Sequence, residues 1–404
     1  MSGVLSALPV YAVAFVFVLS LVVTVHELGH FWAAKSFGVA IDRFSIGFGR
    51  AILSWRDRAG VLWTLGWIPL GGYVRFSGDE NAASVPDQND LAALRAEIVA
   101  SEGEAATSRY FQFKPLWQRA IVVAAGPFSN FILAILLFAA LVMIFGEPVA
   151  EARVRISSPG GPAQVAGIRD GDLILKMDDT PIRGFADLQM YTRLRANTPI
   201  RIQVDRAGTV VQLTATPAEQ EIVDAVSGRM KVGMLGLGPH PDMKFEQKRY
   251  GPIGALAYGT ERTWDILSTT VFYLGRVVTG QIPADQIGSL LGIANTAGKV
   301  AEAGAEGGTT VPMQVFGSFV ALLSLAAFLS VSVGFMNLLP LPVLDGGHLL
   351  FYAYEAVARR PLPAQIQAVG YRLGLALLLG FMLFATWNDL QRLRVFNFLG
   401  GLFS

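Results

Sequence analysis

Two histidines and a glutamate stand close together near the N-terminus, in the sequence HELGH at residues 26–30. On an α-helix His26 and His30 lie on one face, about one turn apart, as two nitrogen ligands of a tetrahedral zinc ion require. Glu27 can take the proton from an attacking water, whose pKa a bound metal lowers to about 7. The spacing therefore predicts a hydrolytic Zn²⁺ site with Glu27 as the catalytic base.

The position of this motif argues against a chance match. The motif falls inside an apolar stretch long enough to cross a membrane, where a charged side chain costs on the order of 2–3 kcal/mol. A purely structural role leaves that cost unexplained. The chain has four histidines and no cysteine, which excludes disulfides and thiolate ligands. Any metal must therefore be held by histidines and carboxylates.

A third metal ligand has to come from a distant part of the chain, because no histidine follows HELGH six residues later. The best candidate is Asp345, in the sequence NLLPLPVLDGGH at the inner end of another apolar stretch. Pro340 and Pro342 break a helix there, and Gly346 and Gly347 are expected to let the backbone turn sharply beside the metal. The alternative is an aspartate that only initiates a turn, which is common by itself.

Four further polar residues each allow a functional and a structural interpretation. Asn337 lies in an apolar segment, where its amide could bind the scissile peptide or only join two helices, worth around 1 kcal/mol. Asn130 allows the same two interpretations, and packing is favoured. His348 is expected to hydrogen-bond the site or cap the next helix rather than bind the metal. His240 is expected to be an ordinary surface histidine.

The composition places the chain among membrane proteins. Its 404 residues are 52% hydrophobic and 16% charged, whereas soluble proteins carry about a quarter charged residues. A net charge of +1 offers no basic field for nucleic acid, so no nucleic-acid partner is expected. Four apolar stretches approach the roughly 20 residues that cross a bilayer. They are residues 9–34, 117–145, 315–341 and 369–387.

The distribution of lysine and arginine predicts the orientation of these spans. Both are frequent between the first and second spans, and Arg359, Arg360 and Arg372 follow the third span. The residues before the first span have neither. Because cytoplasmic loops carry the excess of positive charge, both termini and the long region from about 147 to 312 are expected outside the cytoplasm.

Two other regions have strand-like patterns. Residues 61–77 alternate apolar and small residues around Gly66, Gly71 and Gly72, which predicts β-hairpin strands that dip back toward the membrane. Residues 152–217 alternate short β-branched runs with turns and one helix-like run, which predicts a small α/β module. A helical repeat near 264–278 predicts an interfacial helix.

These patterns together predict a polytopic α-helical membrane protein of about four transmembrane helices, with a membrane-associated β-loop and one extracytoplasmic α/β domain. The first membrane part is expected to hold HELGH and the β-loop, and the last to hold the LDGG sequence. The expected parts are the membrane core at 1–146, the α/β domain at 147–240, interfacial helices at 241–314 and the rest of the membrane core at 315–404.

Four sequences in order, HELGH, PLGGYVRF, GPFSN and NLLPLPVLDGGH, resemble the site-2 protease family of intramembrane zinc metalloproteases, peptidase family M50. The closer similarity is to its bacterial regulator-of-sigma-E protease branch. The resemblance implies that His26, His30 and Asp345 bind zinc, that Glu27 is the catalytic base, and that Asn337 helps to hold the substrate.

The same resemblance implies a PDZ-like extracytoplasmic domain and a multi-pass location in the bacterial inner membrane. It also implies that the PLGGYVRF loop, with Gly71 and Gly72, lies near the substrate. The best-known bacterial members carry two tandem PDZ domains, whereas this chain has room for one. A substrate-size filter made of two stacked domains is therefore not carried over.

The expected reaction is hydrolysis of a peptide bond in a single-span membrane protein, already trimmed outside by an upstream site-1-type protease. An anti-sigma factor or a remnant signal peptide is the expected kind of substrate, and the lipid bilayer is the expected surrounding. The main alternative is a non-catalytic membrane scaffold that binds partners through its PDZ-like domain. A metal-ion transporter is disfavoured, because such proteins distribute polar residues over several spans and contain internal repeats.

Overall fold

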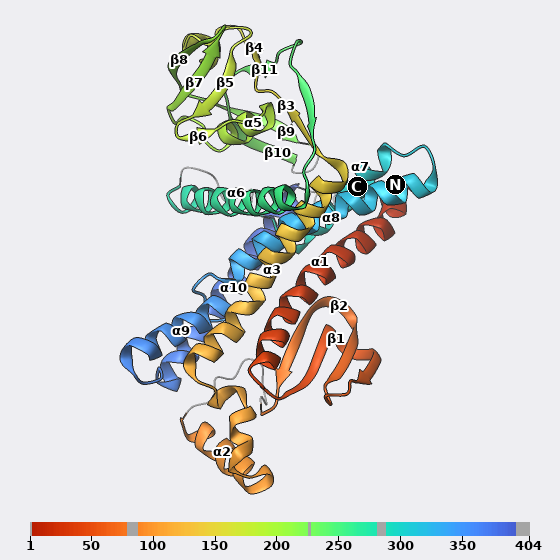
Figure 1. Cartoon of the computed structure of the whole chain (residues 1–404), viewed down its shortest axis with the longest axis vertical. Helices are drawn as coiled ribbons and strands as arrows, with labels where there is room; N and C mark the ends of the chain where they lie inside the picture. Colours follow the sequence, from red (N-terminus) through yellow and green to blue (C-terminus); the bar gives the residue numbers. More distant parts are fainter. Residues whose placement is uncertain (1, 79–87, 225–227, 281–287, 393–404) are drawn as a thin grey trace, which may run out of the picture. The chain divides into compact units, whose positions relative to one another are not determined.

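The chain forms two compact units (Figure 1). The computed structural model describes residues 2–78, 88–224, 228–280 and 288–392. The first unit consists of Met1–Ala139, Leu256–Leu274 and Ile287–Ser404, and the second of Ala140–Ala255 and Gly275–Gln286. Every residue expected to take part in the chemistry belongs to the first unit.

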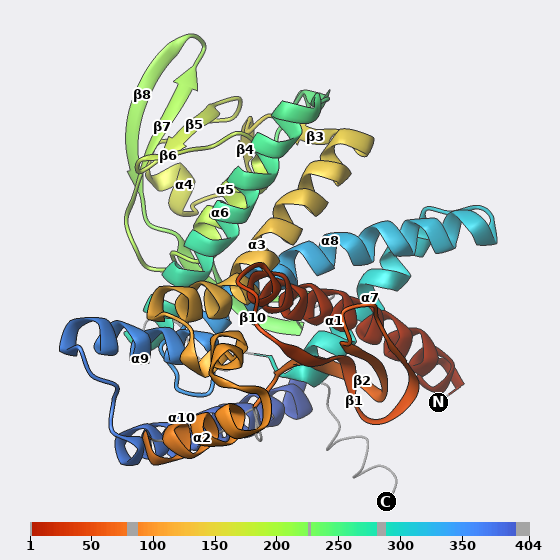
Figure 2. The same cartoon turned by 60° about the horizontal axis from the view of Figure 1, so that its bottom comes forward.

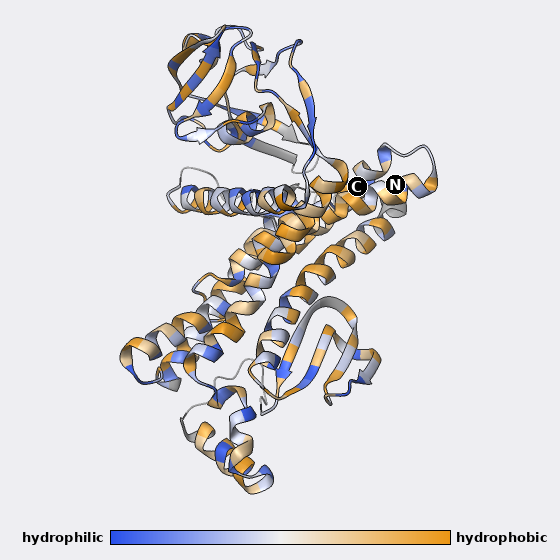
Figure 3. Cartoon of the chain, viewed as in Figure 1, coloured by the Kyte–Doolittle hydropathy of each residue, from blue (hydrophilic) through white to orange (hydrophobic). Residues whose placement is uncertain are grey.

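Four helices among the described residues are long and apolar enough to cross a membrane. They are α1 (Ser2–Ser36), α3 (Leu116–Phe145), α8 (Val311–Asn337) and α10 (Ala364–Arg392). Apolar residues dominate these helices (Figure 3), as expected where lipid rather than water surrounds them. A helix of suitable length and composition covers each of the four predicted spans, although the third helix ends before residue 341, because Pro340 cannot continue it.

Small residues let another helix, α7 (Leu290–Glu306), pack closely on both α1 and α8 (Figure 2). A methyl group on Gly304 of α7 or on Gly317 of α8 would overlap the backbone of the other helix. Gly298 of α7 likewise leaves room for the ring of Tyr11. Small residues at such contacts bring helices together by van der Waals packing, the main attraction available inside a bilayer.

Two long strands of the first unit, β1 (Ile41–Arg56) and β2 (Leu62–Phe76), form an antiparallel hairpin that folds back on itself. Residues 43–46 of β1 pair on one side with residues 62–65 and on the other with residues 72–75 of β2. Residues 72–76 therefore lie at one edge of this sheet. β2 packs against α1 (Figure 1), where the Phe31 ring meets Phe44 and Trp63 at centroid distances of 5.5 and 5.3 Å.

The predicted hairpin strands at 61–77 are present as β2, but their partner β1 was not predicted. β1 contains four charged residues and two glycines with positive φ, Gly47 and Gly49, so its sequence has little regular alternation. The register shifts along the pair show why: bulges bend the strands, and a bent strand does not keep one apolar face.

The second unit is rich in β-structure and has its own core. Its four-stranded sheet has the order β6–β5–β7–β8, and three two-stranded pairs, β3–β12, β4–β11 and β9–β10, accompany it. Alternate residues of β7, among them Ile200 and Val204, point into the core, where they join Ile174 of β5 and residues of α5. The bounds are β3 (Glu147–Ala150), β4 (Val154–Ile156), α4 (Pro162–Val165), β5 (Leu173–Met177), β6 (Thr180–Pro181), α5 (Phe185–Arg193), β7 (Ile200–Arg206), β8 (Thr209–Ala215), β9 (Ala218–Asp224), β10 (Gly228–Met234), β11 (Leu237–Pro239) and β12 (Phe245–Lys248).

The other described helices lie between the elements named above. α6 (Pro252–Val278) falls outside the four helices with the length and composition of a span, and its interfacial position stays a prediction. α2 (Gln88–Glu102) and two short 3₁₀ helices at Glu104–Arg109 and Phe111–Phe113 precede α3. The helix α9 (Asp345–Ala358) follows α8. Residues 79–87, between β2 and α2, lie outside the described residues.

Candidate metal centre

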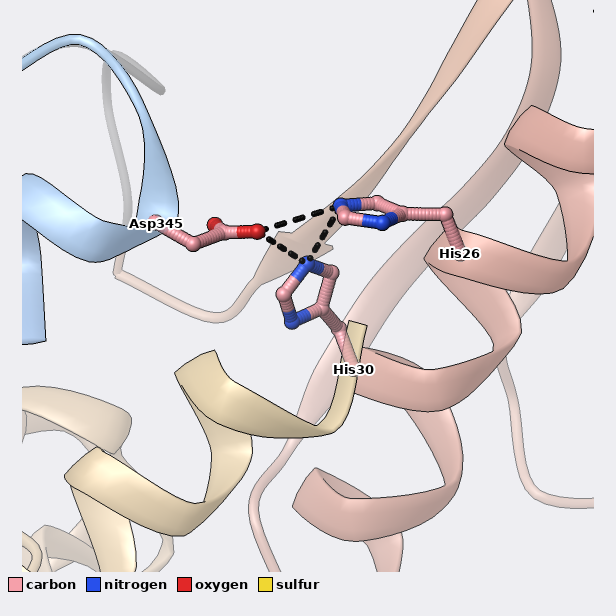
Figure 4. A group of neighbouring side chains, drawn as sticks. All are labelled: His26, His30 and Asp345. Carbon is pink, nitrogen blue, oxygen red and sulfur yellow. Dashed lines mark hydrogen bonds and ion pairs between the residues drawn. The ribbon is translucent and has the colours of Figure 1, made fainter. Parts of the chain in front are cut away.

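The helix α1 presents both histidines of HELGH from one face, as the spacing predicts. The Nε2 atoms of His26 and His30 lie 3.2 Å apart, and their rings are nearly perpendicular (Figure 4). His26 is only 8% exposed. Two imidazole nitrogens thus converge on one largely buried point.

Asp345 approaches this point from another helix. It is the first residue of α9, and its carboxylate is aimed at the two rings (Figure 4). Oδ2 of Asp345 lies 3.1 Å from Nε2 of His26 and 3.5 Å from Nε2 of His30. The structure therefore brings together the three residues that the sequence proposed as metal ligands, from positions more than 300 residues apart.

The three ligand atoms fit a tetrahedral zinc ion. Zinc–ligand distances of 2.0–2.1 Å and tetrahedral angles place neighbouring ligand atoms about 3.3 Å apart, and the three observed separations are 3.1, 3.2 and 3.5 Å. Oδ2 of Asp345 is buried, and apart from these two histidine nitrogens it has no polar partner among the described residues. A buried carboxylate oxygen without a partner is unfavourable unless a cation compensates it. Three protein ligands leave a fourth position for water or substrate.

The prediction that Gly346 and Gly347 allow a sharp turn of the backbone after Asp345 is wrong. Gly346 and Gly347 belong to the first turn of α9, and neither has a positive φ, so they do not provide a sharp turn. A methyl group on Gly346 would overlap the carbonyl oxygen of Leu338, and one on Gly347 would overlap that of Leu341. The glycines are thus explained by the close approach of α9 to the preceding chain, which brings Asp345 back to the histidines.

A second pair of glycines sets the contact between α1 and α3, which sequence reasoning missed. A methyl group on Gly29, inside HELGH, would overlap the carbonyl oxygen of Ala125, and one on Gly126 would overlap the ring of His30. The hydroxyl of Ser129 donates to the carbonyl oxygen of Val25 at 2.8 Å. The GPFSN sequence could have indicated this contact, because its small residues allow two helices to approach closely.

α3 also contacts the ring nitrogens that face away from the metal position. Nδ1 of His30 lies 2.9 Å from the carbonyl oxygen of Val122, to which it donates. Because the proton is then on Nδ1, the lone pair of Nε2 is free for a metal. Nδ1 of His26 lies 3.3 Å from the side-chain amide of Asn130, which is fully buried. Asn130 thus lies against a ligand, a position that its sequence did not specify.

Glu27 lies between the metal ligands and the edge of the β-sheet. The backbone of Val74 in β2 hydrogen-bonds its carboxylate. Gly72 stands close by, since a methyl group there would lie 3.2 Å from Cγ of Glu27 and 2.7 Å from the carbonyl oxygen of Ser45. Gly71 has a φ of 104° and faces the ring of Phe48. The predicted substrate-binding glycines therefore shape the sheet edge beside the base.

A cavity of about 540 Å³ opens at this centre. Its wall includes the three metal ligands, Glu27, and Asn337 at the end of α8. Tyr73, Val74 and Phe76 of the sheet edge form another part of the wall. Asn337 thus lines the cavity, and its role in holding a substrate stays a prediction, whereas Asn130 is not among the lining residues.

The two other histidines have separate environments. His348 lies in α9 and lines the cavity, and the hydroxyl of Tyr371 is 3.1 Å from its Nε2. It therefore hydrogen-bonds beside the site from within a helix. His240 lies in the second unit, where its Nδ1 accepts from the backbone N–H of Asp242 at 3.1 Å. The group of possible metal ligands found among the described residues consists of His26, His30 and Asp345.

The fold and the site together indicate a metal-dependent hydrolase built into a membrane. Its apolar helices carry two histidines and an aspartate that can hold a metal, with a glutamate and a cavity beside them. The chain belongs to peptidase family M50, whose model it matches over residues 14–381. It is therefore a zinc metalloprotease.

Several relatives support this assignment over nearly their whole length. The chain is 56% identical to metalloprotease MmpA of Caulobacter vibrioides, covering 97% of this chain and 98% of that protein. It is 39% identical to a Rhizobium meliloti protein named as a zinc metalloprotease, covering 93% and 95%. It is 30% identical to the regulator of sigma-E protease of Salmonella typhimurium, covering 94% and 98%.

Proposed function

We propose that the protein cleaves a peptide bond within or near the transmembrane segment of a single-span membrane protein. The observation that carries this proposal is the position of the zinc ligands. His26 and His30 belong to the apolar helix α1, whose candidate span runs from Pro9 to Ser36. Chemistry at that depth acts on peptide bonds that soluble proteases cannot reach.

The roles of the residues follow from their positions. Zinc, when bound, supplies a Lewis acid that polarises the scissile carbonyl and makes hydroxide available near neutral pH. Glu27 accepts the proton of the attacking water and returns it to the leaving amine, so that water adds across the C–N bond and the proton count balances. Asn337, which also lines the cavity, holds the substrate chain through its amide.

The sheet edge offers a way to bind an unwound substrate. A transmembrane helix hides its backbone in internal hydrogen bonds, so it must extend locally before hydrolysis. Residues 72–76 form an edge beside Glu27 and the cavity, and an extended peptide can pair with such an edge through main-chain hydrogen bonds. Gly72 keeps the edge clear of side chains at the base.

The substrate class is an anti-sigma factor or a remnant signal peptide, released after an upstream protease has cut the outer part. The relative named regulator of sigma-E protease supports a role in such signalling. In this proposal the second unit is a PDZ domain outside the cytoplasm, and the protein is a multi-pass protein of the bacterial inner membrane. The alternative of a non-catalytic scaffold would use this unit alone and would not need Glu27.

The test is cleavage of a purified single-span substrate in detergent by wild type and Glu27→Gln, with zinc measured on both. We expect the variant to keep its zinc and to cleave at least about 100-fold more slowly, because the general base is lost. Glu246→Gln, at an exposed glutamate of β12, is the matched control and should cleave at the wild-type rate. Cleavage by Glu27→Gln at the wild-type rate, or wild-type protein that binds no zinc, would contradict the proposal.

A further inference from the structure

Asn130 is a fully buried amide in a spanning helix, and the reaction proposed above assigns it no role. Its Nδ2 atom lies 3.3 Å from Nδ1 of His26, whereas its Oδ1 atom is buried and has no hydrogen-bond partner among the described residues. An unpaired buried amide oxygen costs about 1–3 kcal/mol. The reason why this amide oxygen has no partner should therefore be sought in His26, the metal ligand that Asn130 contacts.

The metal decides which hydrogen-bonding partner His26 requires. Nε2 of His26 faces Asp345 and His30, so it must offer its lone pair to zinc, and the ring proton must then be on Nδ1. An Nδ1–H group needs an acceptor, and the Nδ2 amide nitrogen is a donor. The two orientations of a carboxamide have nearly the same shape, and the hydrogen-bond network decides between them. Turning the amide by 180° places Oδ1, the atom without a partner, at Nδ1–H.

We propose that Asn130 is the positioning residue of the first zinc ligand: its amide oxygen accepts the Nδ1 proton of His26 and so directs Nε2 to the metal. It would do for His26 what the carbonyl oxygen of Val122 does for His30. Metal-binding histidines usually have such a partner, often a carboxylate. Inside a membrane an amide performs this role without a second buried charge.

The neighbouring helix holds Asn130 in place. The hydroxyl of Ser330 in α8 donates to the backbone carbonyl of Asn130 at 2.8 Å, and Ser330 is fully buried. Gly334, one turn further on α8, leaves room for Cβ of Asn130, which a methyl group would approach to 3.3 Å. Two small residues of α8 therefore fix the backbone of Asn130, while the side chain is directed to α1.

The test is the dissociation constant of zinc, measured by competition with a chromophoric chelator on the full-length protein in detergent. Asn130→Leu keeps the approximate volume but has no acceptor, and we expect 10- to 100-fold weaker binding, the usual effect of losing such a partner. Asn130→Asp keeps an acceptor oxygen and has no N–H, so its affinity should stay within about threefold of wild type. Ile132→Leu, at an exposed position of the same helix α3, is the control and should bind zinc like wild type.

The aspartate variant makes the outcome decisive even if the leucine variant does not fold. If Nδ2 of Asn130 instead donated to His26, Asn130→Asp would lose that donor and bind zinc at least tenfold more weakly, which would overturn the proposal. Wild-type affinity in a folded Asn130→Leu would also overturn it. The visible spectrum of the cobalt-substituted protein adds a measure of ligand geometry that does not depend on proteolysis. The proposal rests on the zinc site, and loss of cleavage with unchanged zinc affinity would count against the proposed reaction alone.

Discussion

Gly126 sets the space in which the second zinc ligand stands, because a methyl group there would overlap the His30 ring. We expect Gly126→Ala to displace His30 or to push α3 away from α1. A misplacement of about 1 Å at a reacting centre reduces rates on the order of 100-fold. Zinc content and cleavage rate should therefore fall together, which distinguishes this variant from Glu27→Gln, where zinc is retained.

Gly275→Ala is the control for this substitution. Gly275 also lies in a helix, α6, but a methyl group there would meet nothing within 4 Å. Alanine favours a helix over glycine by about 1 kcal/mol, so this variant should unfold at the same or a higher temperature and keep its zinc. If Gly126→Ala also kept full zinc content and activity, the tight contact between α1 and α3 would not position the ligand.

At the residue scale, the sequence predicted what depends on residue type and helical spacing. His26, Glu27 and His30 follow from one helical turn, and Asp345 follows from the small number of carboxylates in apolar stretches. The contact of Asn130 with His26 could not be predicted, because it depends on the alignment of α3 with α1. That alignment is set by Gly29 and Gly126, whose effect appears only when the two helices are together.

At the element scale, the hairpin carries an apolar end that is unusual for a surface exposed to water. Ile52, Leu53 and Trp67 are 63%, 56% and 72% exposed, and the register places residues 51–53 opposite residues 65–66 of β2. Exposed apolar groups of this size mark a surface that contacts another apolar phase. We infer that this end enters the lipid.

Single cysteines test this prediction cleanly, since the chain has none of its own. A polarity-sensitive fluorophore on Ile52→Cys should emit at shorter wavelength in liposomes and resist quenching by aqueous iodide. The same label on Arg58→Cys, exposed in the turn between the two strands, is the control and should be quenched readily. Equal quenching at both sites would mean that the hairpin lies in water.

The hairpin also marks a limit of prediction from sequence. Its β2 strand alternates apolar and small residues and was predicted, whereas β1 was missed because its bulges interrupt the alternation. The glycines of α9 were misinterpreted for a related reason. A glycine in a sequence indicates either backbone freedom or close packing. Only the structure, which places Gly346 and Gly347 in a helix without a positive φ, distinguishes the two.

At the scale of the whole molecule, the direction in which the chain crosses the membrane decides what the cleavage releases. Lysine and arginine are concentrated between the first and second spans, which predicts that α2 and the hairpin face the cytoplasm. The second unit, between the second and third spans, then faces outside. With this orientation a substrate would be cut outside first, and its membrane stub would be released toward the cytoplasm.

Labelling from one side of the membrane tests this orientation. Thr209→Cys lies at the exposed start of β8, and Glu97→Cys lies on the exposed face of α2. In spheroplasts, a maleimide that does not cross membranes should label Thr209→Cys at once and Glu97→Cys only after permeabilisation. The reverse pattern would place the hairpin outside and direct the released fragment away from the cytoplasm. A signal carried to a sigma factor needs the fragment inside, so that result would contradict the proposed anti-sigma substrate while leaving the zinc chemistry unaffected.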